Sequence, residues 1–134
     1  MLNDVSHSVL AVGSSDWLDK DERKTRMHWI YAHLIGDYLI QNDWMAQHKK
    51  NSSFRCAVHV ATYMIPFAWC GMTWWQLLLI AAQHYAIDRT HFVEWFMKAK
   101  GSEKFATGVC FPWSQIVVDN AIHILWMAWV ASLS

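Results

Sequence analysis

Apolar residues recur at helical spacing in four segments of the chain, which polar stretches separate. In the first segment Ile30, Leu34 and Tyr38 lie on one face of a helix. The second is expected to bend or end near Pro66, and Pro112 suits the first turn of the last. Strand signals are weak throughout. The pattern predicts an all-α protein, a compact bundle of about four main helices over residues 27–47, 54–69, 73–98 and 112–134.

The polar stretches fall at 19–26, 48–53 and 98–104, and the first of them is a run of charged residues. A chain of 134 residues is long enough for one domain and too short for two. There is no internal repeat and no Gly-rich phosphate loop. We therefore expect one helical domain over 1–134, with a polar segment at 1–26 and a metal-binding bundle at 27–134.

Two segments are nearly free of charge. No Asp, Glu, Lys or Arg lies between Arg55 and Asp88, and Asp119 is the only one from Gln115 to Ser134. A helix that is apolar on all faces is deeply buried or faces lipid, and four helices offer little protein to bury every face. The pattern predicts a membrane-associated or integral inner-membrane protein. A soluble cytoplasmic protein, as a well-packed bundle or a homo-oligomer, is the alternative.

Composition excludes several classes of protein. Lys plus Arg equals Asp plus Glu, at 11 each, so no global charge points to nucleic acid. Cys56, Cys70 and Cys110 are odd in number and form no Cys-x-x-Cys motif, which argues against disulfides and a cysteine zinc site. The first residues lack a basic region and a long apolar run, so we expect no cleaved signal peptide.

The chain contains eight histidines although 54% of its residues are hydrophobic, so the position of each histidine is informative. Three of them pair with an Asp four residues away, and this spacing places both side chains on one helix face. One such pair is commonly a surface contact, but here three lie in apolar runs of different helices. Unpaired buried carboxylates are costly, and a bound cation removes the cost. With His59, the predicted metal ligands are His33, Asp37, His59, His84, Asp88, Asp119 and His123.

Seven donors exceed what one tetrahedral ion needs and suit two divalent ions that share a bridging carboxylate and a water. Mixed imidazole and carboxylate donors favour zinc or manganese, and iron and magnesium are also compatible. Asp37, Asp88 and Asp119 are the predicted catalytic residues, with Asp88 one candidate for the bridge. Gln41 and Asn120 are candidates for orienting a ligand.

Four motifs carry a family resemblance: HLIGDYLIQNDWMA at 33–46, HVATY at 59–63, HYAIDR at 84–89 and DNAIH at 119–123. In this order they resemble a family of short, uncharacterised phage and bacterial proteins, usually described as membrane proteins, with a domain of unknown function. The likeness covers about residues 28–125. It departs at Asn120, where the family usually has Gln, and at His91, where Lys is common.

More distantly, the His-x-x-x-Asp pairs are similar to those of the zinc-dependent phospholipase C and P1 nuclease group, and of membrane-bound metal-dependent hydrolases. Those proteins are all-helical, use two or three metals and cleave phosphoesters. The resemblance implies a metal-dependent phosphohydrolase, at the level of class only. Its substrate would be a phosphate-containing small molecule or lipid: a phospholipid, a lipid-linked pyrophosphate or a nucleotide.

Two other functions remain open from the sequence. One is a haem-binding electron carrier, with His59, His84 or His123 as axial ligands, which leaves the Asp partners unexplained. The other is a non-enzymatic membrane or partner-binding protein in which a metal only stabilises the bundle. Ferritin-like chemistry is disfavoured because the chain contains no Glu-x-x-His motif.

Overall fold

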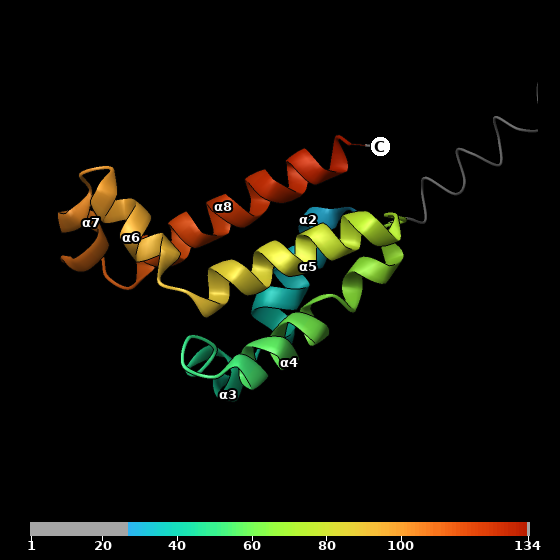
Figure 1. Cartoon of the computed structure of the whole chain (residues 1–134), viewed down its shortest axis with the longest axis horizontal. Coiled ribbons are helices and arrows are strands. Elements are labelled where there is room, and N and C mark those ends of the chain that lie inside the picture. The colour runs from blue at the N-terminus through green and yellow to red at the C-terminus, as the bar shows by residue number, and fades with distance from the viewer. Residues whose placement is uncertain (1–26, 134) are drawn as a thin grey trace, which may run out of the picture.

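The computed structural model describes residues 27–133, so the expectations for the segment 1–26 lie outside the described residues. Over 27–133 the chain is helical and has no strand, which confirms the all-α prediction (Figure 1). The elements are α2 (Trp29–Leu34), the π-helix η1 (Ile35–Ile40), α3 (Asp43–Ala46), α4 (Ser53–Tyr63), the 3₁₀-helix η2 (Pro66–Trp69), α5 (Trp74–Arg89), α6 (Phe92–Ala99), α7 (Glu103–Thr107) and α8 (Trp113–Ala131).

Residues 27–47 do not form the single continuous helix that the sequence predicts. The α-helix α2 continues directly into the π-helix η1. The helix then ends at Gln41 and Asn42, whose backbones are extended. Asn42 begins α3 as its N-cap, where its side-chain oxygen accepts a hydrogen bond from the backbone N–H of Met45 at 3.1 Å. Asn favours this position over a helix interior. Because apolar residues continue at helical spacing on both sides of Gln41 and Asn42, the sequence pattern does not predict the break.

The predicted helix over 73–98 is likewise two helices. The expected capping box is present at its start, where the Thr73 N–H donates to the Gln76 side chain at 2.9 Å. The helix ends at Thr90, whose backbone is extended and whose hydroxyl donates to the Ala86 carbonyl at 2.7 Å. The chain then turns into α6. A Ser or Thr side chain that forms a hydrogen bond to a nearby backbone group competes with the hydrogen bonds of the helix. This competition explains why α5 ends at Thr90.

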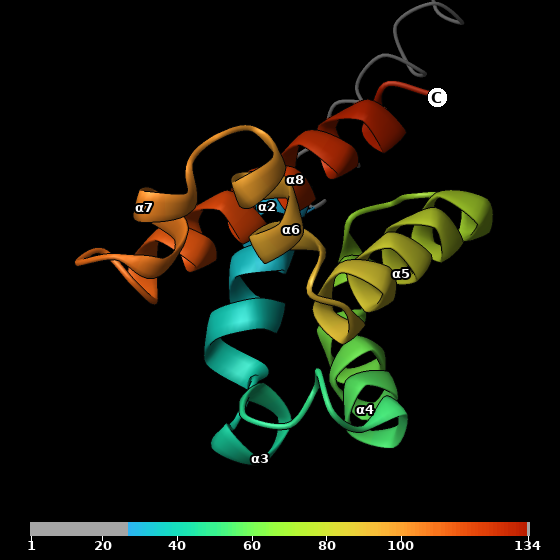
Figure 2. The ribbon, with the colours of Figure 1, turned by 60° about the vertical axis from the view of Figure 1, so that its left-hand side comes forward.

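Four elements surround the centre of the molecule. α5 packs against α4 on one side and against α8 on the other, while the α2–η1 segment contacts both α4 and α8 (Figures 1 and 2). α6 and α7 cover one end of α8. Two apolar clusters result, one around Tyr63 and Ile80 and a second around Ile87 and Met97. His84 lies on α5 between Ile80 and Ile87, so polar groups occupy the space between the two clusters.

The outer faces of these helices keep much of the apolar character seen in the sequence. Trp74 is 76% exposed, Trp113 is 72% exposed and Leu125 is 70% exposed. Within residues 27–133, no helix combines the length and the hydropathy that are needed to cross a membrane.

Candidate metal centre

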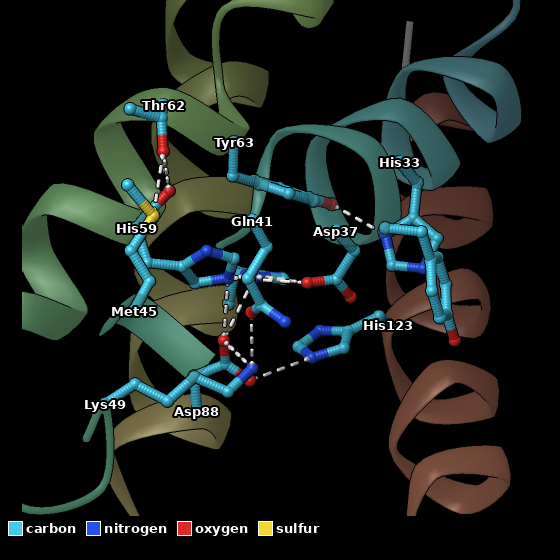
Figure 3. Close-up of polar contacts among 12 residues, drawn as sticks. His33, Asp37, Gln41, Met45, Lys49, His59, Thr62, Tyr63, Asp88 and His123 are labelled. Atoms are coloured by element: carbon cyan, nitrogen blue, oxygen red, sulfur yellow. Dashed lines mark hydrogen bonds and ion pairs between the residues drawn. The ribbon is translucent and has the colours of Figure 1, made fainter. Parts of the chain in front are cut away.

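Six of the seven predicted ligands come together in the interior. Their ligand atoms form two groups, and within each group these atoms lie within 4.8 Å of one another. Asp88 belongs to both groups. Figure 3 shows side chains from η1, α4, α5 and α8 that point toward this common centre. The first group is Asp37, His59, His84 and Asp88, and the second is Asp88, Asp119 and His123.

The first group is deeply buried, with exposures of 0% for both imidazoles, 7% for Asp37 and 2% for Asp88. Asp88 Oδ2 lies 3.0 Å from His59 Nε2 and 3.3 Å from His84 Nε2. Asp37 Oδ1 lies 3.3 Å and 3.7 Å from the same two nitrogens, which are themselves 3.0 Å apart. Donors about 2.1 Å from a tetrahedral ion are about 3.4 Å apart, so these separations match a ligand shell.

The second group uses the other oxygen of the same carboxylate. His123 Nε2 lies 3.7 Å from Asp88 Oδ1 and 3.6 Å from Asp119 Oδ2. Asp88 therefore directs Oδ2 to one group and Oδ1 to the other, which is the arrangement of a carboxylate that bridges two ions. Asp119 is 24% exposed, so this second group is the one that reaches toward solvent.

Two of the atoms that point into the centre lack a hydrogen bond. Asp37 Oδ1 and His123 Nε2 are buried and have no hydrogen-bond partner among the residues that the structure describes. A buried acceptor without a partner costs about 1–3 kcal/mol. Coordination of a cation would satisfy both atoms, so the donor set fits a metal.

Electrostatics prepare Asp88 and His84 for a cation. Burial opposes ionisation of Asp88, but the neighbouring imidazoles of His123, His59 and His84 outweigh it and hold the pKa of this carboxyl well below its ordinary value. Burial lowers the pKa of His84. Ionised carboxylates and neutral imidazoles are the forms that bind metals.

His33, the seventh predicted ligand, lies outside both groups. Its Nδ1 is 3.0 Å from the Tyr63 hydroxyl and its Nε2 is 3.0 Å from Asn120 Oδ1, so both ring nitrogens are engaged. The π-helix η1 explains the separation from Asp37. A π-turn is wider than an α-turn, so four residues make less than a full turn and the two side chains diverge.

His33 instead contacts Tyr63, the tyrosine that packs against the predicted ligand His84. The ring of Tyr63 stacks on the ring of His84 with centroids 3.7 Å apart and planes 11° apart. His33 fixes the hydroxyl of that tyrosine, and Asn120 also donates to the Tyr38 hydroxyl. Asn120 thus contacts His33, and its role in orienting a ligand stays a prediction. His91 is exposed and its nearest charged partner is Glu94, at 3.8 Å, so it takes no part in the centre.

Sequence reasoning missed Lys49. Its Nζ lies 2.8 Å from Asp88 Oδ2 and 3.2 Å from Gln41 Oε1, and only 15% of its side chain is exposed. The residue falls in the polar stretch 48–53, where a lysine is ordinarily solvated, so nothing in the pattern marks it. Tyr63 was missed for a similar reason, since an aromatic residue in an apolar run is usually core. A signal for Gln41 did exist, because it extends the face that carries Asp37.

Gly36 allows η1 to approach α4 closely enough to bring Asp37 into the centre. A Cβ on Gly36 would lie 2.6 Å from Tyr63 Cδ2 and 2.8 Å from the Tyr63 carbonyl oxygen. Gly36→Ala should therefore lower the free energy of unfolding by about 1–3 kcal/mol in chemical denaturation. The same substitution in an open helix raises stability by about 0.5–1 kcal/mol. A stabilised Gly36→Ala variant would contradict this packing.

The second group should bind metal in a pH-dependent way. Burial alone would lower the pKa of His123, but the nearby carboxylates of Asp119 and Asp88, at 3.6 Å and 3.7 Å from Nε2, outweigh it and raise the pKa to about 9. Below that pH an entering ion must displace a proton, so its apparent affinity should rise about tenfold per pH unit and level off above 9. Calorimetry in buffers of different ionisation enthalpy measures the released proton. His123→Gln should abolish the proton release from this group, and an unchanged release would contradict the prediction.

Residues 26–134 match the model of a family described as protein of unknown function (DUF3307), and the chain belongs to this family. The prediction of a family of unknown function is thereby confirmed. No curated protein and no solved structure matches the chain. The more distant likeness to phosphoester hydrolases stays a prediction.

Proposed function

We propose that the chain is a metal-dependent phosphohydrolase that binds two divalent ions, one in each group, with Asp88 as the bridge. The observation that carries this proposal is that the two carboxylate oxygens of Asp88 face different sets of donors. Paired ions with a shared ligand are the arrangement used for displacement at phosphorus. Three imidazoles and three carboxylates favour zinc or manganese over magnesium or calcium.

A cavity supports catalysis over a purely structural metal. Structural zinc sites are closed, whereas catalytic sites leave a position open to water or substrate. Asp88 and Asp119 line a cavity of about 220 Å³ beside the start of α8. A substrate in this cavity would lie against the second group, while the first group stays enclosed by protein.

When bound, divalent ions lower the pKa of a coordinated water and stabilise charge on phosphoryl oxygens. The protein's own contribution begins with the six donors, which fix the position of the reacting centre. Asp119 is the most exposed of the three carboxylates and lies on the cavity wall, where it can accept a proton from water. Tyr63, stacked on His84, keeps that imidazole in its orientation.

The geometry argues against the haem alternative. A haem that has two axial histidines needs them on opposite faces of the porphyrin. His59 Nε2 and His84 Nε2 are 3.0 Å apart, and the rings of His84 and His123 have centroids 4.3 Å apart. These separations leave no space for a porphyrin plane between the imidazoles.

The test is hydrolysis of p-nitrophenyl phosphate and of bis(p-nitrophenyl) phosphate by purified protein. Turnover of at least one ester should disappear with a chelator and return with zinc or manganese. His91→Ala is the matched control, because this histidine is 71% exposed and should leave the rate unchanged. Full metal occupancy without turnover of either ester would contradict the enzyme and leave a structural metal.

A further inference from the structure

The cavity beside the candidate metal centre has walls of two kinds. Its inner end is formed by Asp88 and Asp119, the carboxylates of the second group. The segment after α3 contributes two cationic side chains, and α6, the segment just before α8 and α8 itself contribute apolar ones. The residues used below are Lys49 and Lys50 on the first wall and Phe111 and Ile116 on the second.

The cationic wall is prepared to receive an anion once metal is bound. Lys49 Nζ contacts Asp88 Oδ2 at 2.8 Å, and the same oxygen faces His59 Nε2 at 3.0 Å. An ion in the first group would take that oxygen and repel the ammonium. Because Lys49 already lines the cavity, its ammonium would turn toward the cavity and to an anion bound there. Lys50, whose Nζ donates to the Thr90 carbonyl at 3.2 Å, is a second cation in the lining of the same cavity.

The apolar part of the cavity lining fits an organic substituent. Phe111 is 56% exposed and Ile116 is 37% exposed, so both keep apolar surface that a ligand can cover. The volume of about 220 Å³ is below the range of about 300–1,000 Å³ that is typical of sites for drug-sized ligands. The cavity therefore suits a phosphate together with a small apolar group, or the phosphate end of a larger molecule.

From these two walls we infer the substrate class: a phosphate ester with an apolar or aromatic group next to the phosphate. Its phosphate lies between the second group and Lys49, and its apolar group lies against Phe111 and Ile116. Lys49 is then the residue that selects the anion, and Phe111 is the residue that selects the substituent. This inference rests on the proposed function and goes beyond it by naming the substrate.

The first test compares two phosphonates that cannot be hydrolysed and differ only in the substituent. Calorimetry with zinc-loaded protein should show phenylphosphonate binding about tenfold more tightly than methylphosphonate, because the ring buries apolar surface. Phe111→Ala should reduce this preference below about threefold while leaving methylphosphonate affinity unchanged. Phe105→Ala is the control, since Phe105 is 46% exposed and does not line the cavity.

The second test uses Lys49→Gln, which should weaken both phosphonates by about tenfold or more. Zinc affinity should stay the same or increase, because a competing cation is removed from Asp88. Lys104→Gln, an exposed lysine on α7, should change neither quantity. Loss of zinc from Lys49→Gln would mean that Lys49 holds the ligands in place, and it would overturn the anion-binding role.

Equal binding of the two phosphonates, or a preference that survives Phe111→Ala, would overturn the substrate class. If zinc-dependent hydrolysis of the nitrophenyl esters persists in that case, the proposed function stands. The absence of both hydrolysis and phosphonate binding would overturn both.

Discussion

Replacing Asp88 by Asn should remove metal from both groups and lower kcat/KM for phosphoester hydrolysis by about 10³-fold or more. Each ion would lose an anionic ligand, and loss of about 4 kcal/mol of transition-state stabilisation corresponds to such a factor. Asn keeps the size of Asp, so a change in packing does not explain the loss. Elemental analysis and steady-state kinetics on the same preparation measure both effects.

The control for this prediction is Asp43→Asn, at an exposed position in the first turn of α3. It should keep full occupancy and activity. Because Asp88→Asn also leaves Lys49 without its carboxylate, helicity and thermal unfolding must be followed in parallel. A folded Asp88→Asn protein that retains two ions would contradict the bridging role.

Asp37→Asn and Asp119→Asn should each remove one of the two ions, because each residue belongs to one group only. The expected occupancy is about one ion per chain in either single variant, and turnover should fall about 10²-fold or more because both ions act on the phosphoryl group. Metal counting separates the two groups more directly than kinetics does. Loss of both ions from either single variant would show one coupled site instead of two.

Six of the seven predicted ligands fall in the two groups that could hold metal, and most of them could be located from the spacing of His and Asp along the sequence. A His and an Asp four residues apart in an apolar run share a face wherever the helix is regular. This holds for α5 and α8, which deliver His84 with Asp88 and Asp119 with His123. The placement of His59 followed from its isolation among apolar residues of α4.

The same reasoning failed where the backbone leaves the regular α-helix. The π-helix η1 turns Asp37 toward the centre and His33 toward Tyr63 and Asn120, and no residue type marks it in the sequence. Asn42 and Thr90 divide predicted helices through side-chain contacts to the backbone, each within a short polar stretch that apolar residues flank on both sides.

Contacts between segments that are distant in the sequence could not be predicted either. The pairing of Lys49 with Asp88 joins residues 39 positions apart, from the segment after α3 and from the end of α5. Its partner is known only once α4 and α5 are packed together. The cavity that leads to Asp119 depends in the same way on how α6 and α8 meet.

The most direct test of the central claim is the number of metal ions that the protein binds. Protein treated with chelator and then dialysed against zinc or manganese should contain two equivalents per chain by elemental analysis and show no Soret absorption. Wild-type protein that is folded and binds no divalent ion, or that carries haem, would contradict the account.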